Sequence, residues 1–258
     1  MTSPTADPER LAAARRRLAE AGVEVLGEDH HILGISKSAG VLSQPGPPGI
    51  PSLVEMVDAY RREAEAKPGR AYVGLVHRLD RNVSGAMVLG KTSKAASRLS
   101  AAFRSREGVE KLYLAWTAGV PPAERGTLRT ALVRDVVRRV TRAIPAEEAE
   151  GDPDDLAVLD YEVEARTDRA ARLLVRLRTG QTHQIRAQLA REGLPLFGDV
   201  KYGGPAAPAG ARCDRPALHA RRLVVPHPVG GAPVAIEAPL PEDLARLDRV
   251  LGLHPPAV

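Results

Sequence analysis

The pattern of apolar and polar positions predicts helices at four places in the chain. In each of them apolar side chains recur three or four positions apart, as in a helix that packs one face on a core. The predicted helices begin at Pro8, Ser52, Thr92 or Ser93, and Thr182. Asp7 precedes the first, and Asp, Ser and Thr are the side chains that cap helix N-termini. This first helix carries many charged side chains, so we expect it to be a surface appendage.

Short apolar runs, separated by Gly, Pro and acidic residues, predict strands and turns. The predicted strands are two within 23–42, and then 71–76, 86–89, 110–119, 127–133, 135–144, 156–165 and 172–177. We expect the last two to pair as an antiparallel hairpin. We also expect residues 1–8 to be disordered and the acidic segment 145–155 to be a mobile loop.

Composition narrows this picture. Hydrophobic residues make up 43% of the 258 residues and aromatic residues only 3%, so the core must consist of Leu, Val, Ala and Ile. The 37 basic and 32 acidic side chains leave a net charge of +5, which weakly favours an anionic partner. Cys213 is the single cysteine, which excludes an intramolecular disulfide and a thiolate metal site. Without a signal peptide or a run of ~20 apolar residues, the chain is predicted to be cytoplasmic.

One stretch concentrates polar residues between two apolar runs. It extends from His77 to Gly85 and contains one carboxylate, Asp80, with Arg78 and Arg81 beside it. A neighbouring cation favours the ionised form of an aspartate, so the stretch predicts a charged, nucleophilic carboxylate on a loop. The alternative is a salt-bridged aspartate in an ordinary turn.

A second polar cluster lies where a strand turns at Gly180 and leads into a helix. Thr182 is placed to cap this helix, and Arg186 falls four positions later on the face that also carries Thr182 and His183. The free N–H groups and positive dipole of a helix start suit a phosphate or a carboxylate. The alternative is a surface helix with a solvated arginine.

Tyr113 lies in the predicted strand 110–119. Side chains alternate between the faces of a strand, so Tyr113 points away from the face that carries Leu112, Leu114 and Trp116. We expect that apolar face to pack on the core. A buried tyrosine with a satisfied hydroxyl is the simplest interpretation of Tyr113 from the residues alone.

Ordered motifs across residues 23–228 resemble the RluA family of pseudouridine synthases. Four of them match the family patterns H-R-L-D-x-x-T-S-G (77–85), K-x-Y-x-A (111–115), T-G-R-T-H-Q-I-R (179–186) and G-x-P-I-x-G-D-x-x-Y-G (193–203). Two more lie at 28–40 and 218–228. Val83, Ser38 and Gln181 depart from the family, which has Thr, Pro and Arg at these positions.

The resemblance implies an α+β pseudouridine synthase catalytic fold, with a long mixed, mainly antiparallel sheet, flanking helices and a central cleft. We expect one catalytic domain over 21–258. An N-terminal tail and surface helix over 1–20 would precede it, and residues 1–20 are too few for a further small RNA-binding domain. We expect a monomer.

The resemblance also implies the site. Asp80 would be the catalytic residue, Arg186 its ionic partner and Tyr113 the active-site tyrosine, while Ile185 would line the uracil pocket. We expect the substrate to contact His77, Arg78, Leu79, Arg81, Thr182 and His183.

Three further residues of the family motifs have interpretations of their own. Lys37 is either an ordinary exposed lysine or a substrate contact. We interpret Asp199 and Tyr202 as structural, hydrogen-bonding residues of a turn and not as a second acid.

The implied reaction breaks the bond between ribose and uracil N1 and rejoins the base through C5. It conserves every atom, so we expect no cofactor and no metal, and none of the histidines has the i, i+4 spacing of a metal site. The substrate would be structured ribosomal or transfer RNA with a flipped-out uridine. Two alternatives are a non-catalytic RNA-binding or chaperone protein on the same fold, and a glycoside or nucleoside hydrolase. Glycosidases generally need two carboxylates, and the chain offers one well-placed candidate.

Overall fold

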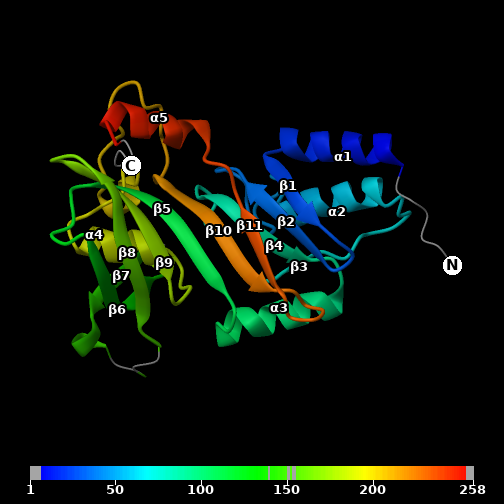
Figure 1. The fold of residues 1–258 in the computed structure, drawn as a ribbon, viewed down its shortest axis with the longest axis horizontal. Helices are drawn as coiled ribbons and strands as arrows, with labels where there is room; N and C mark the ends of the chain where they lie inside the picture. Colours follow the sequence, from blue (N-terminus) through cyan, green and yellow to red (C-terminus); the bar gives the residue numbers. More distant parts are fainter. Residues whose placement is uncertain (1–6, 139, 150–151, 153–154, 254–258) are drawn as a thin grey trace. The chain divides into compact units, whose positions relative to one another are not determined.

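The computed structural model describes residues 7–138, 140–149, 152 and 155–253. These form two compact units, the first from Met1–Val109 with Leu223–Ala238 and the second from Glu110–Arg222 with Pro239–Val258 (Figure 1). The predicted single domain over 21–258 and its central cleft stay predictions. Most of the segment predicted to be disordered, and part of the predicted acidic loop at 145–155, lie outside the described residues.

The first unit is built on a sheet with the strand order β1-β2-β4-β10. The strands are β1 (Val23–Glu28), β2 (Ile32–Lys37), β3 (Gly74–Leu75), β4 (Ser84–Gly90), β10 (Leu218–Pro226) and β11 (Pro233–Glu237). Of β10, the part from Leu223 on belongs to this unit and the part up to Arg222 belongs to the second unit. β3 pairs with β4, and β11 pairs with β10. The ladders of β1, β2, β3 and β4 are antiparallel. Every residue of β4 is buried, which places the strand after the Asp80 loop in the core of this unit.

Three helices cover the strands of this unit, and the N-cap residues predicted for them from the sequence are confirmed. α1 (Pro8–Glu20) is capped by Asp7, α2 (Leu53–Ala64) by a capping box of Ser52 and Glu55, and α3 (Ser93–Ser105) by Thr92. α1 and α2 lie side by side (Figure 1). Ala14 and Leu18 of α1 are buried, so this helix is a packed part of the unit and not an appendage.

The second unit contains the strand order β10-β5-β9-β8-β6-β7. The strands other than β10 are β5 (Glu110–Ala118), β6 (Arg125–Asp135), β7 (Val140–Pro145), β8 (Ala157–Arg166) and β9 (Ala170–Leu177). The predicted hairpin of β8 and β9 is confirmed, and every ladder among β5 to β9 is antiparallel. The predicted strand 135–144 is wrong at its start, because residues 136–138 form the turn between β6 and β7. The α+β, mainly antiparallel fold class is confirmed.

Helices pack on the strands of the second unit. α4 (Gln184–Arg191) lies against β6 and β7, and α5 (Glu242–Leu251) packs Leu244 and Leu247 on a cluster around Trp116. The described residues of this unit also include the short 3-10 helices η1 (Ala146–Glu148) and η3 (Val200–Tyr202). As expected, the buried side chains of both units are mostly Leu, Val, Ala and Ile.

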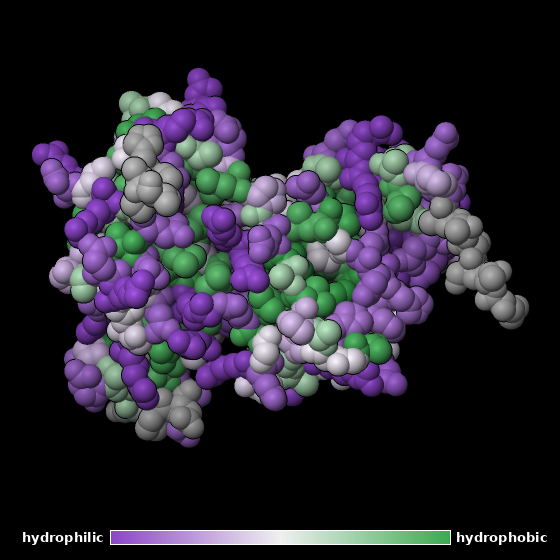
Figure 2. All heavy atoms as spheres, viewed as in Figure 1, coloured by the Kyte–Doolittle hydropathy of each residue, from purple (hydrophilic) through white to green (hydrophobic). Residues whose placement is uncertain are grey.

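Hydrophilic side chains cover much of the visible surface of each unit, with hydrophobic ones between them (Figure 2). None of the helices among the described residues combines the length and the apolar character needed to cross a bilayer. Within the same residues, no three His, Cys, Asp or Glu side chains are gathered in a way that could hold a metal ion.

Candidate active site

Asp80 lies in the loop that joins β3 to β4. Its carbonyl oxygen accepts a hydrogen bond from Val83 N at 3.0 Å, which closes a turn over residues 80–83. Leu79 and Val83 are buried on either side, and the Ser43 hydroxyl donates to Leu79 O at 2.7 Å. The apolar Val83 therefore anchors the turn by burial at the position where the family has Thr. The backbone that carries the half-buried Asp80 side chain is fixed on both sides.

Lys37 is fully buried at the end of β2 and binds the loop that carries Asp80 through the backbone. Its ammonium donates to the carbonyl oxygens of Ser38 and Val41 at 3.0 Å and of Arg81 at 3.2 Å. The interpretation of Lys37 as an exposed lysine is therefore wrong. Ser38 N donates to Gly22 O at 2.8 Å, a bond that the family's proline could not make.

Arg78 and Arg81 are exposed and contact groups other than the Asp80 carboxylate. Arg78 Nη1 donates to Gln44 Oε1 at 3.2 Å, and Arg81 Nε donates to Gly40 O at 3.0 Å. Neither forms an ion pair with Asp80 within the described part of the chain. Their proximity to Asp80 in the sequence predicted that these arginines would pair with its carboxylate. The conformation of the loop directs their guanidinium groups to Gln44 and Gly40 instead.

His77 packs inside the first unit. Its Nε2 accepts from Val88 N at 3.0 Å, and its ring stacks on Phe103 with centroids 4.6 Å apart and planes 17° apart. Because Nε2 accepts, Nδ1 carries the proton of the neutral ring. These contacts fix the start of the loop, and the substrate contact predicted for His77 stays a prediction.

In the second unit, Tyr113 is half-buried in β5, opposite Val175 of β9. Leu114 and Trp116 are buried as predicted, whereas Leu112 is only half-buried. One position before Leu112, the Lys111 ammonium donates to Thr179 O at 2.8 Å. This bond ties β5 to the loop that leads into α4.

The start of α4 differs from the prediction. His183 stands at the N-cap in the left-handed region, with φ of +58°, and the Thr182 hydroxyl makes no cap. The Gln184 side chain instead organises the turn before the helix: its Oε1 accepts from the Thr179 hydroxyl at 2.8 Å and from Gln181 N at 3.1 Å. The expected cap by Thr182 is wrong because a buried glutamine, anchored on Val158 O at 3.1 Å, organises the turn.

Arg186 is buried in the first turn of α4 and forms a bidentate ion pair with the buried Asp199. Arg186 Nε lies 2.7 Å from Asp199 Oδ2, and Nη2 lies 2.7 Å from Oδ1. The guanidinium carbon is 4.8 Å from the centroid of the Tyr202 ring. The solvated-arginine alternative is therefore wrong. Ile185 beside it is also buried, in keeping with an apolar pocket wall.

Glycines shape the turn that carries Asp199 and Tyr202. Gly198 has φ of +72°, and a Cβ there would meet Arg215 O at 2.2 Å. A Cβ on Gly204 would meet Leu196 O at 1.9 Å. Only glycine fits these two positions, and Gly203, which ends the G-D-x-x-Y-G motif, has a positive φ of +77°. The glycines therefore encode a tight turn that presents both side chains to α4. The sequence indicated a structural role for this pair but not its partner Arg186.

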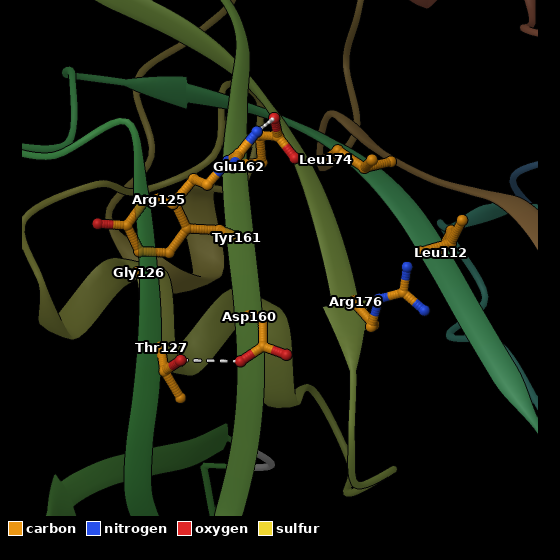
Figure 3. Close-up of a pocket in the computed structure, with 9 residues that line it drawn as sticks. All are labelled: Leu112, Arg125, Gly126, Thr127, Asp160, Tyr161, Glu162, Leu174 and Arg176. Carbon is orange, nitrogen blue, oxygen red and sulfur yellow. Dashed lines mark hydrogen bonds and ion pairs between the residues drawn. The ribbon is translucent and has the colours of Figure 1, made fainter.

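A groove of about 330 Å³ lies on one face of the strands of the second unit (Figure 3). Its lining is Leu112, Arg125, Gly126, Thr127, Asp160, Tyr161, Glu162, Leu174 and Arg176. Charges along it neutralise each other, as in the 2.6 Å pair of Arg125 with Glu162. It contains no predicted site residue. Because Leu112 lines it, Tyr113 belongs to the opposite face of β5, so this groove is distinct from the predicted site.

Each unit thus gathers part of the predicted site. Residues 77–81 share one anchored loop in the first, while Thr182, His183, Ile185 and Arg186 share the start of α4 in the second. Buried Arg186 supplies a fixed cation, and the Asp80 turn supplies a carboxylate on a rigid backbone. The predicted Asp80–Arg186 pair joins residues of different units and stays a prediction.

Comparison with known proteins places the chain. The family described as RNA pseudouridylate synthase matches residues 31–191. Ribosomal large subunit pseudouridine synthase D of Xanthomonas campestris is 35% identical over 235 residues, which is 87% of this chain and 68% of that protein. The protein of the same name from Pseudomonas aeruginosa is 35% identical over 231 residues, 86% of this chain and 69% of that protein.

A solved structure agrees at the level of the fold. Human RNA Pseudouridylate Synthase Domain Containing 4 aligns with a TM-score of 0.78 and 22% identity, over 96% of this chain and 99% of that chain. The α+β architecture and the sequence similarity point to one conclusion. The chain belongs to the RNA pseudouridylate synthase family, whose members are isomerases that act on RNA.

Proposed function

We propose that this enzyme isomerises uridines of large-subunit ribosomal RNA and that Asp80 is its catalytic carboxylate. The RNA target is supported by two relatives that are named ribosomal large subunit pseudouridine synthases. The catalytic assignment is carried by the anchored loop: Val83 N binds Asp80 O, and Lys37 and Gly40 N bind Arg81 O. A carboxylate on such a fixed backbone needs little reorganisation to meet a bound nucleoside.

The proposed reaction is a balanced isomerisation. The bond between ribose C1′ and uracil N1 breaks, the base turns, and a bond forms between C1′ and C5. C5 loses its proton and N1 gains one, so no oxidant, reductant or other co-reactant is consumed. The ionised Asp80 either bonds to the sugar or promotes a glycal intermediate, and both routes use a single carboxylate.

Residues of the second unit complete the proposal. Arg186 supplies the positive charge that pairs with the Asp80 carboxylate and orients it. Ile185 packs on the uracil, and Tyr113 stacks on the base or moves a proton at the ribose or C5. The target uridine must leave its stack to reach these groups, which is least costly in a single-stranded loop.

Exposed arginines of the Asp80 loop suit the RNA backbone. Arg78 and Arg81 offer guanidinium groups to phosphates, so binding should weaken steeply with salt. Transfer RNA is the second candidate target. A cytoplasmic location and a monomeric state stay predictions.

Tritium release tests the function. Transcripts of large-subunit ribosomal RNA and of transfer RNA, both labelled with [5-³H]uridine, are incubated with the full chain, and the nucleosides are then analysed. Tritium release from the ribosomal transcript, with pseudouridine as product, supports the proposal. Release of free uracil would instead make the chain a hydrolase, and tight RNA binding without conversion would make it a binding protein.

A further inference from the structure

The turn Asp199–Tyr202 contacts both polar residues that open α4. Asp199 binds Arg186, and the Tyr202 hydroxyl lies 2.7 Å from His183 Nδ1. All four residues belong to the second unit. We infer that this turn is the positioning element of the site: Asp199 fixes the Arg186 guanidinium, and Tyr202 fixes His183 as the tautomer that carries its proton on Nε2. The inference deepens the proposed function and rests on it.

The Tyr202 hydroxyl determines the tautomer. Thr141 N donates to its oxygen at 2.9 Å, so one lone pair is used and the hydroxyl proton is left to donate. Among the described contacts of this hydroxyl, His183 Nδ1 is the acceptor. An Nδ1 that accepts carries no proton, so the neutral ring presents Nε2–H as a donor.

The ionisation state of Tyr202 agrees with a donor role. Burial raises the pKa of its phenol above the ordinary value of 10.0, although Thr141 N–H and the nearby Arg186 act in the other direction. The hydroxyl therefore keeps its proton at neutral pH. The edge of the Tyr202 ring meets the His183 ring, with centroids 5.6 Å apart and planes at 90°.

His183 needs such support because its backbone is strained. A non-glycine residue with φ of +58° is uncommon and persists where its surroundings hold it, often at functional sites. Thr141 belongs to β7, so the phenol that holds His183 is itself held by the sheet. Three elements, namely α4, η3 and β7, thus meet at one hydroxyl.

The Asp199 carboxylate has a matching role for Arg186. Its two oxygens engage Nε and Nη2, which fixes the plane of the guanidinium, and the Tyr202 ring lies against the same group. A bidentate pair specifies orientation as well as charge. Neither Asp199 nor Tyr202 is assigned a contact with the RNA, so both act through Arg186 and His183.

Nitrogen NMR tests the tautomer without reference to activity. The full chain is labelled with ¹⁵N, and the His183 ring is assigned by comparison with His183→Gln. We expect the Nε2–H tautomer in the wild type and a mixture in Tyr202→Phe, which keeps the ring and loses the hydroxyl. Tyr161→Phe is the control, because this buried tyrosine of the same unit packs on Gly126. An Nδ1–H tautomer in the wild type, or an unchanged signal in Tyr202→Phe, would overturn the inference.

Single-turnover kinetics test the positioning role. We expect Tyr202→Phe and Asp199→Asn to lower the rate at saturating RNA by about 10- to 100-fold, with the dissociation constant for RNA unchanged. Tyr202→Phe preserves the Arg186 ion pair, so this variant alone tests the positioning role if Asp199→Asn does not fold. An equal loss of RNA affinity, or a wild-type rate in Tyr202→Phe, would refute positioning. A wild type inactive on every RNA would refute the proposed function instead, and the NMR result would still stand.

Discussion

Arg186 and Asp199 form a bidentate ion pair in the interior of the second unit, with both joining distances at 2.7 Å. Buried charges of this kind are costly unless each has its partner, and removal of one partner leaves the other uncompensated. Loss of either partner should therefore destabilise the fold around α4, and the intact pair sets the direction of a cation assigned to the active site.

The first prediction concerns that pair. Asp199→Ala should lower the free energy of unfolding by about 3–5 kcal/mol, because it leaves the Arg186 charge buried without this partner. Urea denaturation measures the change. Glu162→Ala is the control: it removes the exposed pair with Arg125 and should cost roughly 0–1 kcal/mol. A similar small loss in both variants would contradict the importance given to burial.

Lys37 gives a second prediction, in the first unit. Lys37→Met keeps the length of the side chain but removes the donor to three carbonyl oxygens, and should cost about 1.5–3 kcal/mol of stability. The turn that carries Asp80 should loosen, so the rate of pseudouridine formation should fall as well. Lys67→Met, at an exposed lysine paired with Glu65, should change neither quantity. A wild-type rate in Lys37→Met would show that this clamp does not position the loop.

His227 and Asp29 make stability depend on pH. The hydrogen bond to Val229 O raises the pKa of His227 above the ordinary 6.5, and Asp29 adds to this against the effect of burial. Burial raises the pKa of Asp29, but hydrogen bonds from Ile32 N, His31 N and His227 outweigh it and bring the pKa below 3.8.

The directions of these two pKa shifts define the pH range in which the His227–Asp29 pair stabilises the folded state. A raised histidine pKa stabilises fully below pH ~6.5, and this contribution is lost as pH rises through the pKa of the folded state. A lowered aspartate pKa stabilises above pH ~4, and this contribution is lost as pH falls through the pKa of the folded state. His227→Gln should therefore cost roughly 0.2–1 kcal/mol near pH 5.5 and less near pH 9. Urea denaturation at the two pH values measures it, with the exposed His30→Gln as control. An equal cost at both would contradict the linkage.

Features that depend on local chemistry could be predicted from the sequence. Asp7, Ser52 and Thr92 cap their helices because a side-chain oxygen two or three positions before an N–H is a local matter. The cap predicted at Thr182 is wrong because His183 stands at the N-cap, and the buried Gln184 side chain fixes the preceding turn through bonds to Thr179 and Val158. Such contacts depend on tertiary packing, which periodicity does not report.

For the candidate site too, the sequence predicted local features but not tertiary contacts. The motif located Asp80 on a loop, but it did not reveal that Lys37 is buried, because Arg81 O, one of its partners, lies 44 residues away along the chain. Nor did spacing reveal that Arg186 binds Asp199, although the glycines around that aspartate marked a tight turn.

Arg186 itself gives a further prediction. Arg186→Ala should lower the single-turnover rate by about 100-fold or more, because the proposed partner of Asp80 is lost. Arg191→Ala removes an arginine from the end of the same helix, where it pairs with Glu192, and should retain the wild-type rate. Circular dichroism and RNA binding show whether the variant is folded. A folded Arg186→Ala with wild-type activity would exclude Arg186 from the mechanism.

The assignment of Asp80 is tested most directly by tritium release from [5-³H]uridine RNA with Asp80→Asn and Asp80→Ala, beside Asp168→Asn at an exposed turn. We expect no release from either Asp80 variant, RNA binding like that of the wild type, and full activity in Asp168→Asn. Measurable turnover by Asp80→Ala would contradict the account.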